Sequence, residues 1–84
     1  MKIQSSLDWQ EVGGELTKQL NKLPYNRDLR KFAHNIAVMV IELSKLEVDA
    51  RRINKLEYTK EKVDSINKAI DHLEKLLLIA KLMS

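Results

Sequence analysis

The sequence of 84 residues contains no cysteine, two glycines, one proline and four aromatic residues. Without cysteine there are no disulfide bonds, thiolate metal ligands or thiol nucleophiles. So few glycine and proline residues argue against disorder and against a β-rich fold. The abundant residues are instead Leu, Lys, Glu and Ile, which favour helices. A chain of this length forms one domain, whose small core is marginal unless copies associate.

Long hydrophobic runs are also missing from the sequence. The longest, Ile36–Ile41 and Leu76–Ala80, span six and five residues, whereas a membrane-spanning helix needs about 20. The first ten residues lack the charged start and apolar stretch of a signal peptide. We therefore expect a soluble cytoplasmic protein with no membrane partner.

Three helices are predicted, over residues 7–23, 26–54 and 59–83, as one all-α domain spanning residues 1–84. Apolar residues recur in each segment at helical spacing. Ser5 or Ser6, Asn26 and Thr59 are candidate N-caps. The short second connection makes the two long helices an antiparallel hairpin with arms of roughly 35–40 Å. The bundle is then completed by oligomerisation.

Two local features modify the first predicted helix. Its apolar stripe begins at Leu7, and Trp9 is expected to hold it against the hairpin. The pair Gly13-Gly14 weakens a helix by about 1 kcal/mol per glycine. We expect a kink, a late start or fraying there. Within the third helix, Asp64 with Lys68 and Asp71 with Lys75 are spaced for ion pairs.

More apolar side chains are present than one hairpin buries. Some lie on the second helix opposite its core stripe, and others surround the end of the third helix, which indicates burial on all sides. The alternative is a monomer in which the first helix covers more of them. The candidate oligomer-interface residues are Val38, Ile41, Val48, Leu78, Ile79, Leu82 and Met83.

The net charge of +3 is confined to the middle of the chain, because residues 26–62 hold nine basic and six acidic side chains. Several basic residues share the outer face of the second helix, a pattern suited to tracking a phosphate backbone. A solvated face, or one lining an oligomer seam, is the alternative. The candidate nucleic-acid-binding residues are Arg27, Arg30, Lys31, Lys45, Arg51 and Arg52.

Catalytic chemistry is not indicated. His34 and His72 have neither a further histidine nor a cysteine to complete a metal site. The carboxylates are dispersed and mostly spaced for pairing with Lys or Arg, so no acid–base dyad stands out. We expect no enzyme, no cofactor and no bound metal. Tyr25 and Tyr58 flank helix ends, where each either packs beside a turn or stacks on a base.

Three stretches resemble bacterial four-helix-bundle proteins. The first, Leu20-Asn-Lys-Leu-Pro-Tyr-Asn-Arg-Asp-Leu29, is similar to the junction before their long second helix. Ile41-Glu-Leu43 through Ala50-Arg51 resembles the end of that helix. Residues 63–80, with Asn67, Ile70 and Leu73 at the family's spacing and a late Ala80, resemble the third helix.

That group comprises the ribosomal RNA intervening-sequence proteins and the accessory variability determinant (Avd) of diversity-generating retroelements. The resemblance covers residues 20–83, without a fourth helix, and Ile79 stands where the family usually has Arg. It implies a basic homo-oligomeric barrel, pentameric in Avd, that binds nucleic acid and a reverse transcriptase.

Two functions therefore remain open. The first is a nucleic-acid-binding oligomer that assists a reverse transcriptase or another polymerase in a mobile element. The alternative is a phage or mobile-element adaptor or regulator that binds a host factor through its apolar helix faces. A purely structural bundle needs only self-association. Salt-dependent nucleic-acid binding distinguishes the first function from the others.

Overall fold

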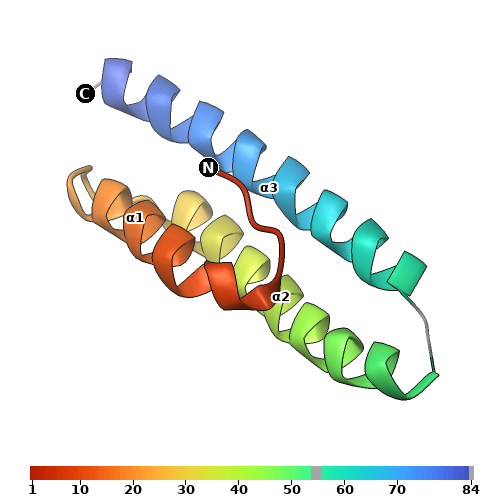
Figure 1. Cartoon of the computed structure of the whole chain (residues 1–84). Coiled ribbons are helices and arrows are strands. Elements are labelled where there is room, and N and C mark those ends of the chain that lie inside the picture. Colours follow the sequence, from red (N-terminus) through yellow and green to blue (C-terminus); the bar gives the residue numbers. More distant parts are fainter. Residues whose placement is uncertain (54–55, 84) are drawn as a thin grey trace.

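The computed structural model describes residues 1–53 and 56–83, and of residues 50–53 and 56 it describes the backbone only. All regular structure in these ranges is helical, which confirms the all-α prediction (Figure 1). A 3-10 turn, η1 (Ser6–Asp8), leads into α1 (Trp9–Asn21). The long helices α2 (Arg27–Ile53) and α3 (Leu56–Met83) follow.

Helices α2 and α3 run antiparallel along the length of the molecule, whose longest dimension is 48 Å (Figure 1). Each presents one apolar stripe to the other at helical spacing. Helix α1 lies against the first half of α2 and also contacts α3, so it closes one side of the hairpin. The buried core residues are Ile3, Val12, Leu16, Leu20, Leu29, Ile36, Val40, Leu43, Ile66, Ile70, Leu73 and Leu77.

An extended N-terminal segment crosses the hairpin before η1 begins (Figure 1). The backbone N–H of Ile3 donates to Asn67 Oδ1 at 2.7 Å, and Asn67 Nδ2 donates to the carbonyl of Ile3 at 2.9 Å. At the other end of the segment, both the backbone N–H and the hydroxyl of Ser6 donate to the Glu47 carboxylate, at 2.7 and 2.9 Å. The segment thus binds to α3 at one end and to α2 at the other.

Two helix starts follow the capping predictions and one does not. Ser5 forms a reciprocal capping box with Asp8, and Asn26 Oδ1 accepts the backbone N–H of Leu29 at 3.1 Å. The prediction for Thr59 is wrong, because α3 already begins at Leu56. Glu57 lies in that first turn, where the helix macrodipole favours an anion. The Thr59 hydroxyl is buried and has no hydrogen-bond partner among the described residues.

The predicted disturbance at Gly13-Gly14 is absent, since α1 is continuous from Trp9 to Asn21. Burial of Val12 and its stripe on the hairpin outweighs the low helix propensity of glycine. Trp9 packs against the core as expected, and its indole occupies the space beside Gly13. Leu7 was wrongly placed on the buried stripe: it precedes α1 and is 85% exposed.

Ion pairs partly follow the predicted spacing. Lys75 Nζ lies 3.3 Å from Asp71 Oδ2, as expected. The predicted pair of Asp64 with Lys68 is not among the ion pairs of the described residues. The shortest pair instead joins the two long helices, with Lys62 Nζ 2.6 Å from Glu42 Oε2.

Candidate nucleic-acid and self-association surfaces

Four of the six candidate basic residues have described side chains, all on α2. Arg27, Lys31 and Lys45 are exposed, and Arg30 is half-buried. The side chains of Arg51 and Arg52 lie outside the described part of the structure. The structure therefore places the side chains of the first four residues on α2, and the role of all six in binding stays a prediction.

The junction between α1 and α2 gathers most of this charge. Residues 21–31 carry four basic side chains, Lys22, Arg27, Arg30 and Lys31, against the single acid Asp28. This basic junction carries a net charge of +3, equal to that of the whole chain. It also coincides with the start of α2, where the helix macrodipole is positive. An anion near this end is attracted by both the side chains and the backbone.

Tyr25 and Arg30 stack at the centre of the basic junction. The guanidinium carbon of Arg30 lies 5.4 Å from the Tyr25 ring centroid, within the range of a cation–π interaction. Arg30 Nη2 also donates to Asn21 Oδ1 at 3.3 Å. The Tyr25 side chain is nonetheless 75% exposed. Tyr25 thus packs beside the turn through its contact with Arg30, while most of the residue stays accessible, and base stacking stays a prediction.

Lys45 lies apart from the junction, several helical turns further along α2. Its charge acts on the carboxyl group of Glu42, whose pKa lies below its usual value. A hydrogen bond from Lys62 is the main cause, and the charges of Lys62 and Lys45 add to it against the effect of desolvation. Lys45 thus lies in a locally compensated environment, unlike the residues of the junction.

All seven candidate interface residues are exposed on the single chain. Three of them form an outer seam on α2, spaced as a helix-packing stripe. These residues are Val38, Ile41 and Val48. The other four form an apolar end on the last turns of α3. These residues are Leu78, Ile79, Leu82 and Met83. Exposure is what an interface requires before assembly, and their role as an interface stays a prediction.

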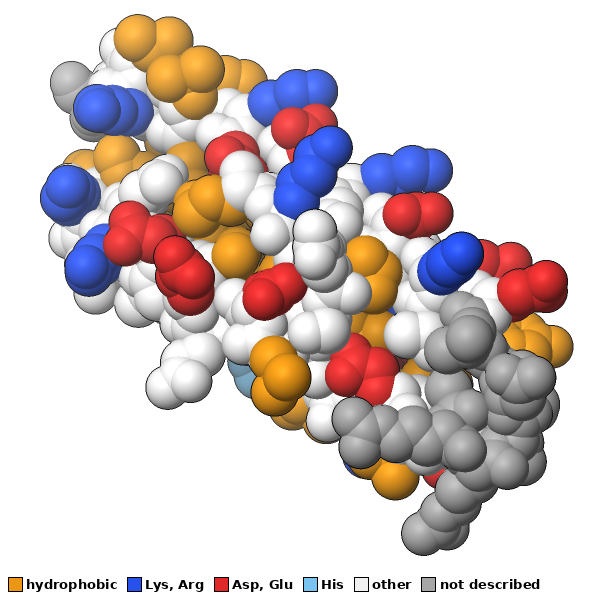
Figure 2. Space-filling view, viewed as in Figure 1, with side chains coloured by type: hydrophobic (Ala, Val, Ile, Leu, Met, Phe, Trp, Pro, Cys, Tyr) orange, Lys and Arg blue, Asp and Glu red, His pale blue; other side chains and the backbone are white. Residues whose placement is uncertain are grey.

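The apolar end adjoins the basic junction. Figure 2 shows hydrophobic side chains gathered over the C-terminal end of α3. A groove of 450 Å³ separates this end from the turn before α2, and Tyr25 and Asn26 line it opposite Ile79 and Met83. Surfaces suited to self-association and to anions therefore lie side by side.

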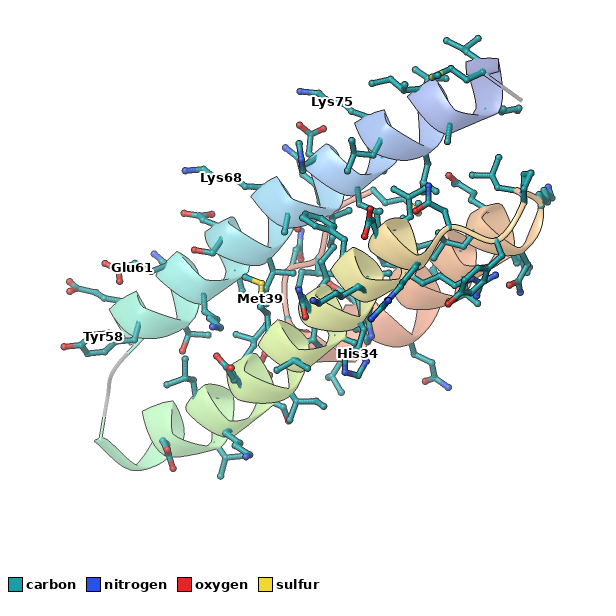
Figure 3. All side chains as sticks on the ribbon, turned by 180° about the vertical axis from the view of Figure 1, so that it is seen from behind. His34, Met39, Tyr58, Glu61, Lys68 and Lys75 are labelled. Atoms are coloured by element: carbon teal, nitrogen blue, oxygen red, sulfur yellow. The ribbon has the colours of Figure 1, made fainter. Side chains whose placement is uncertain are left out.

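The outer side of α3 is different. Lys68 and Lys75 project from it, away from α2 (Figure 3). Both are exposed, and acidic residues alternate with them along the helix. On this face, unlike at the basic junction, the lysines alternate with acidic residues, as is usual on a solvent-exposed helix.

Within the described ranges, no group of three or more histidine, cysteine or acidic residues is placed to hold a metal ion. His72 instead contacts the Phe32 ring, with centroids 5.4 Å apart, and His34 lies on the exposed side of α2 (Figure 3). No helix in the same ranges is long and apolar enough to cross a membrane.

Sequence reasoning missed Lys22 and Asn21 as members of the junction. Lys22 lies outside residues 26–62, the segment to which the net charge was assigned, and a sum over a long segment hides a local cluster at its end. Summing the charges over a shorter window around Pro24 would have revealed this basic cluster.

Compared with protein-family models, with curated proteins and with solved structures, the chain matches none.

Proposed function

We propose that this chain is a non-catalytic, self-associating protein that binds nucleic acid at its basic junction. The observation that carries the proposal is the local charge: four basic side chains and one acidic side chain surround the start of a long helix. Contacts of Lys and Arg with phosphates supply most non-specific affinity for nucleic acid. The proposal includes a cytoplasmic location.

The charges of the junction are available for an anionic ligand. Arg27 and Lys31 are exposed, and neither takes part in an ion pair among the described residues. Arg30 is held by an amide oxygen and a ring, so its positive charge is not neutralised. A phosphate group can therefore bind these cations without displacing a carboxylate from an ion pair.

Self-association supports this function because of where the apolar end lies. Copies that pack through Ile79 and Met83, which line the groove beside Tyr25 and Asn26, bring their basic junctions near the same interface. More phosphates are then contacted per assembly, which steepens the dependence on salt. The resemblance to the Avd group supports a role beside a reverse transcriptase or another polymerase.

Charge reversal tests the proposal. We expect Arg27→Glu with Lys31→Glu to weaken binding of a labelled oligonucleotide. Loss of two phosphate contacts makes the slope of log K against log salt shallower by roughly 1.4 to 1.8. The matched control, Lys60→Glu with Lys68→Glu, makes the same charge change on α3. If both pairs of substitutions weaken binding equally, the junction is not the site.

A protein adaptor is the second candidate, favoured by the outer seam. Ile41 and Val48 are each more than half exposed on the single chain, and a helix packing on such a stripe is a common recognition mode. Under this alternative Ile41→Lys abolishes capture of a protein partner, and nucleic-acid binding at low salt is absent.

A further inference from the structure

Tyr25 is exposed in a position that the fold holds in place. Leu23, two residues earlier, packs against the core, and Leu29, four residues later, is buried in it. Between them, the side chain of Asn26 caps α2. An aromatic ring on such a short, anchored turn loses little further freedom when a ligand binds to it.

One face of the Tyr25 ring lies against Arg30, and the exposed remainder of the side chain lines the groove beside Ile79 and Met83. The guanidinium carbon of Arg30 lies 5.4 Å from the ring centroid, and Arg30 Nη2 also donates a hydrogen bond to Asn21 Oδ1. Residue Tyr25 as a whole remains 75% exposed. This arrangement leaves a flat aromatic surface of the size that a nucleobase covers, backed by a cation.

The charges around the ring suit the phosphates on either side of a stacked base. Lys22, Arg27 and Lys31 are exposed on the same junction, and Asp28 is its one acidic residue. In proteins that bind single strands, basic grooves follow the backbone while aromatic side chains stack on bases. A base inside a duplex has both faces covered by its neighbours, so only an unpaired base can use this ring.

We infer that Tyr25, backed by Arg30, is a stacking platform for an unpaired base, and that the basic junction binds single-stranded nucleic acid in preference to duplex. This inference rests on the proposed function and specifies its ligand. The shared chemistry is an unpaired base with flanking phosphates, which RNA and DNA both supply.

The test compares Tyr25→Leu with Tyr25→Phe and with the wild-type protein. The probes are a short fluorescently labelled single-stranded RNA, DNA of the same sequence, and a fully paired blunt-ended duplex of that sequence, each titrated by anisotropy. We expect Tyr25→Leu to weaken single-strand binding about 5- to 150-fold, the range for one stacked base. Tyr25→Phe retains the affinity, and duplex binding changes little in either variant.

Tyr58→Leu is the matched control, because it removes another exposed tyrosine from a helix end remote from the junction. Circular dichroism checks that all variants remain helical. If the wild type binds with salt dependence but Tyr25→Leu binds single strands equally well, the platform is wrong and the proposed function stands. If the wild type binds no oligonucleotide at low salt, both are wrong.

Discussion

Asn67 holds the N-terminal segment to α3 with both polar atoms of its amide. Replacing it with Ala leaves the N–H and the carbonyl of Ile3 without these partners in a partly buried site. We expect Asn67→Ala to lower the free energy of unfolding by about 1–3 kcal/mol. Urea denaturation followed by circular dichroism measures this loss.

The control for Asn67 is Asn35→Ala. Asn35 is exposed on α2, so its replacement changes helix propensity in the same way without removing a contact to Ile3. Equal unfolding free energies for the two variants would mean that the N-terminal segment contributes nothing to stability.

These contacts at residue scale were not predictable from the sequence. Ile3 and Asn67 are 64 positions apart, and an extended segment with one buried side chain has no periodicity to detect. The basic candidates were predictable, because Arg27 and Lys31 share one side of a regular helix. Stacking of Tyr25 on Arg30 was not, since the direction of a side chain leaving a turn depends on the packing around it.

At the scale of the element, α1 shows how packing determines what a glycine costs. A Cβ at Gly13 would lie 2.8 Å from Trp9 Cε2, whereas nothing lies within 4 Å of one at Gly14. We expect Gly14→Ala to stabilise the protein by up to about 1 kcal/mol through helix propensity. Gly13→Ala instead forces the indole off the core and destabilises it.

Thermal unfolding and Trp9 fluorescence are measured on both the Gly13→Ala and the Gly14→Ala variants. Gly13→Ala alone shifts the emission to longer wavelength, because the indole becomes more exposed to water. The packing of Trp9 over Gly13 is contradicted if the two alanine variants are equally stable and fluoresce like the wild type.

The ion pair between Lys62 of α3 and Glu42 of α2 makes the stability of the fold depend on pH. The pKa of Glu42 is lower in the folded state because Lys62 donates a hydrogen bond to it. The link therefore stabilises the fold above the unfolded pKa of about 4.3. Its contribution is lost as pH falls through the lower folded pKa. We expect Lys62→Met to lower the Tm slightly at pH 7, and this deficit to shrink as Glu42 becomes protonated at acid pH.

Lys68→Met is the control for that experiment, since Lys68 is exposed on α3 and forms none of the ion pairs seen among the described residues. Its effect on Tm does not follow the Glu42 titration. A Lys62→Met deficit that persists unchanged at pH 3 would show that packing of the lysine stem, not the charge, links the helices.

Helix type and register were predictable because apolar periodicity alone determines them. The bounds of α2 were predicted within one residue and the start of α3 only within three. Thr59 resembles an N-cap in sequence, yet α3 already begins at Leu56, three residues earlier. A residue type suited to capping marks a helix start only if the backbone before it is not helical. The sequence alone does not determine that.

At the scale of the whole molecule, the exposed apolar surfaces predict self-association. We expect the wild type to sediment with a mass that is a multiple of 9.8 kDa. Leu78→Lys with Leu82→Lys puts charges into the apolar end and reduces the mass to that of one chain. Ser44→Lys with Ser65→Lys adds the same charges at exposed polar positions. It leaves the assembly intact, and a monomeric wild type would contradict the prediction.

Binding of nucleic acid across a salt series tests the central claim most directly. A labelled single strand is titrated with the wild-type protein from low to physiological salt by fluorescence anisotropy, and the mass of the assembly is measured on the same sample. We expect affinity to fall steeply and linearly in log salt, since several phosphates are neutralised at each assembled junction. Absence of binding at the lowest salt would contradict the claim and leave the basic junction as a solvated or interfacial surface.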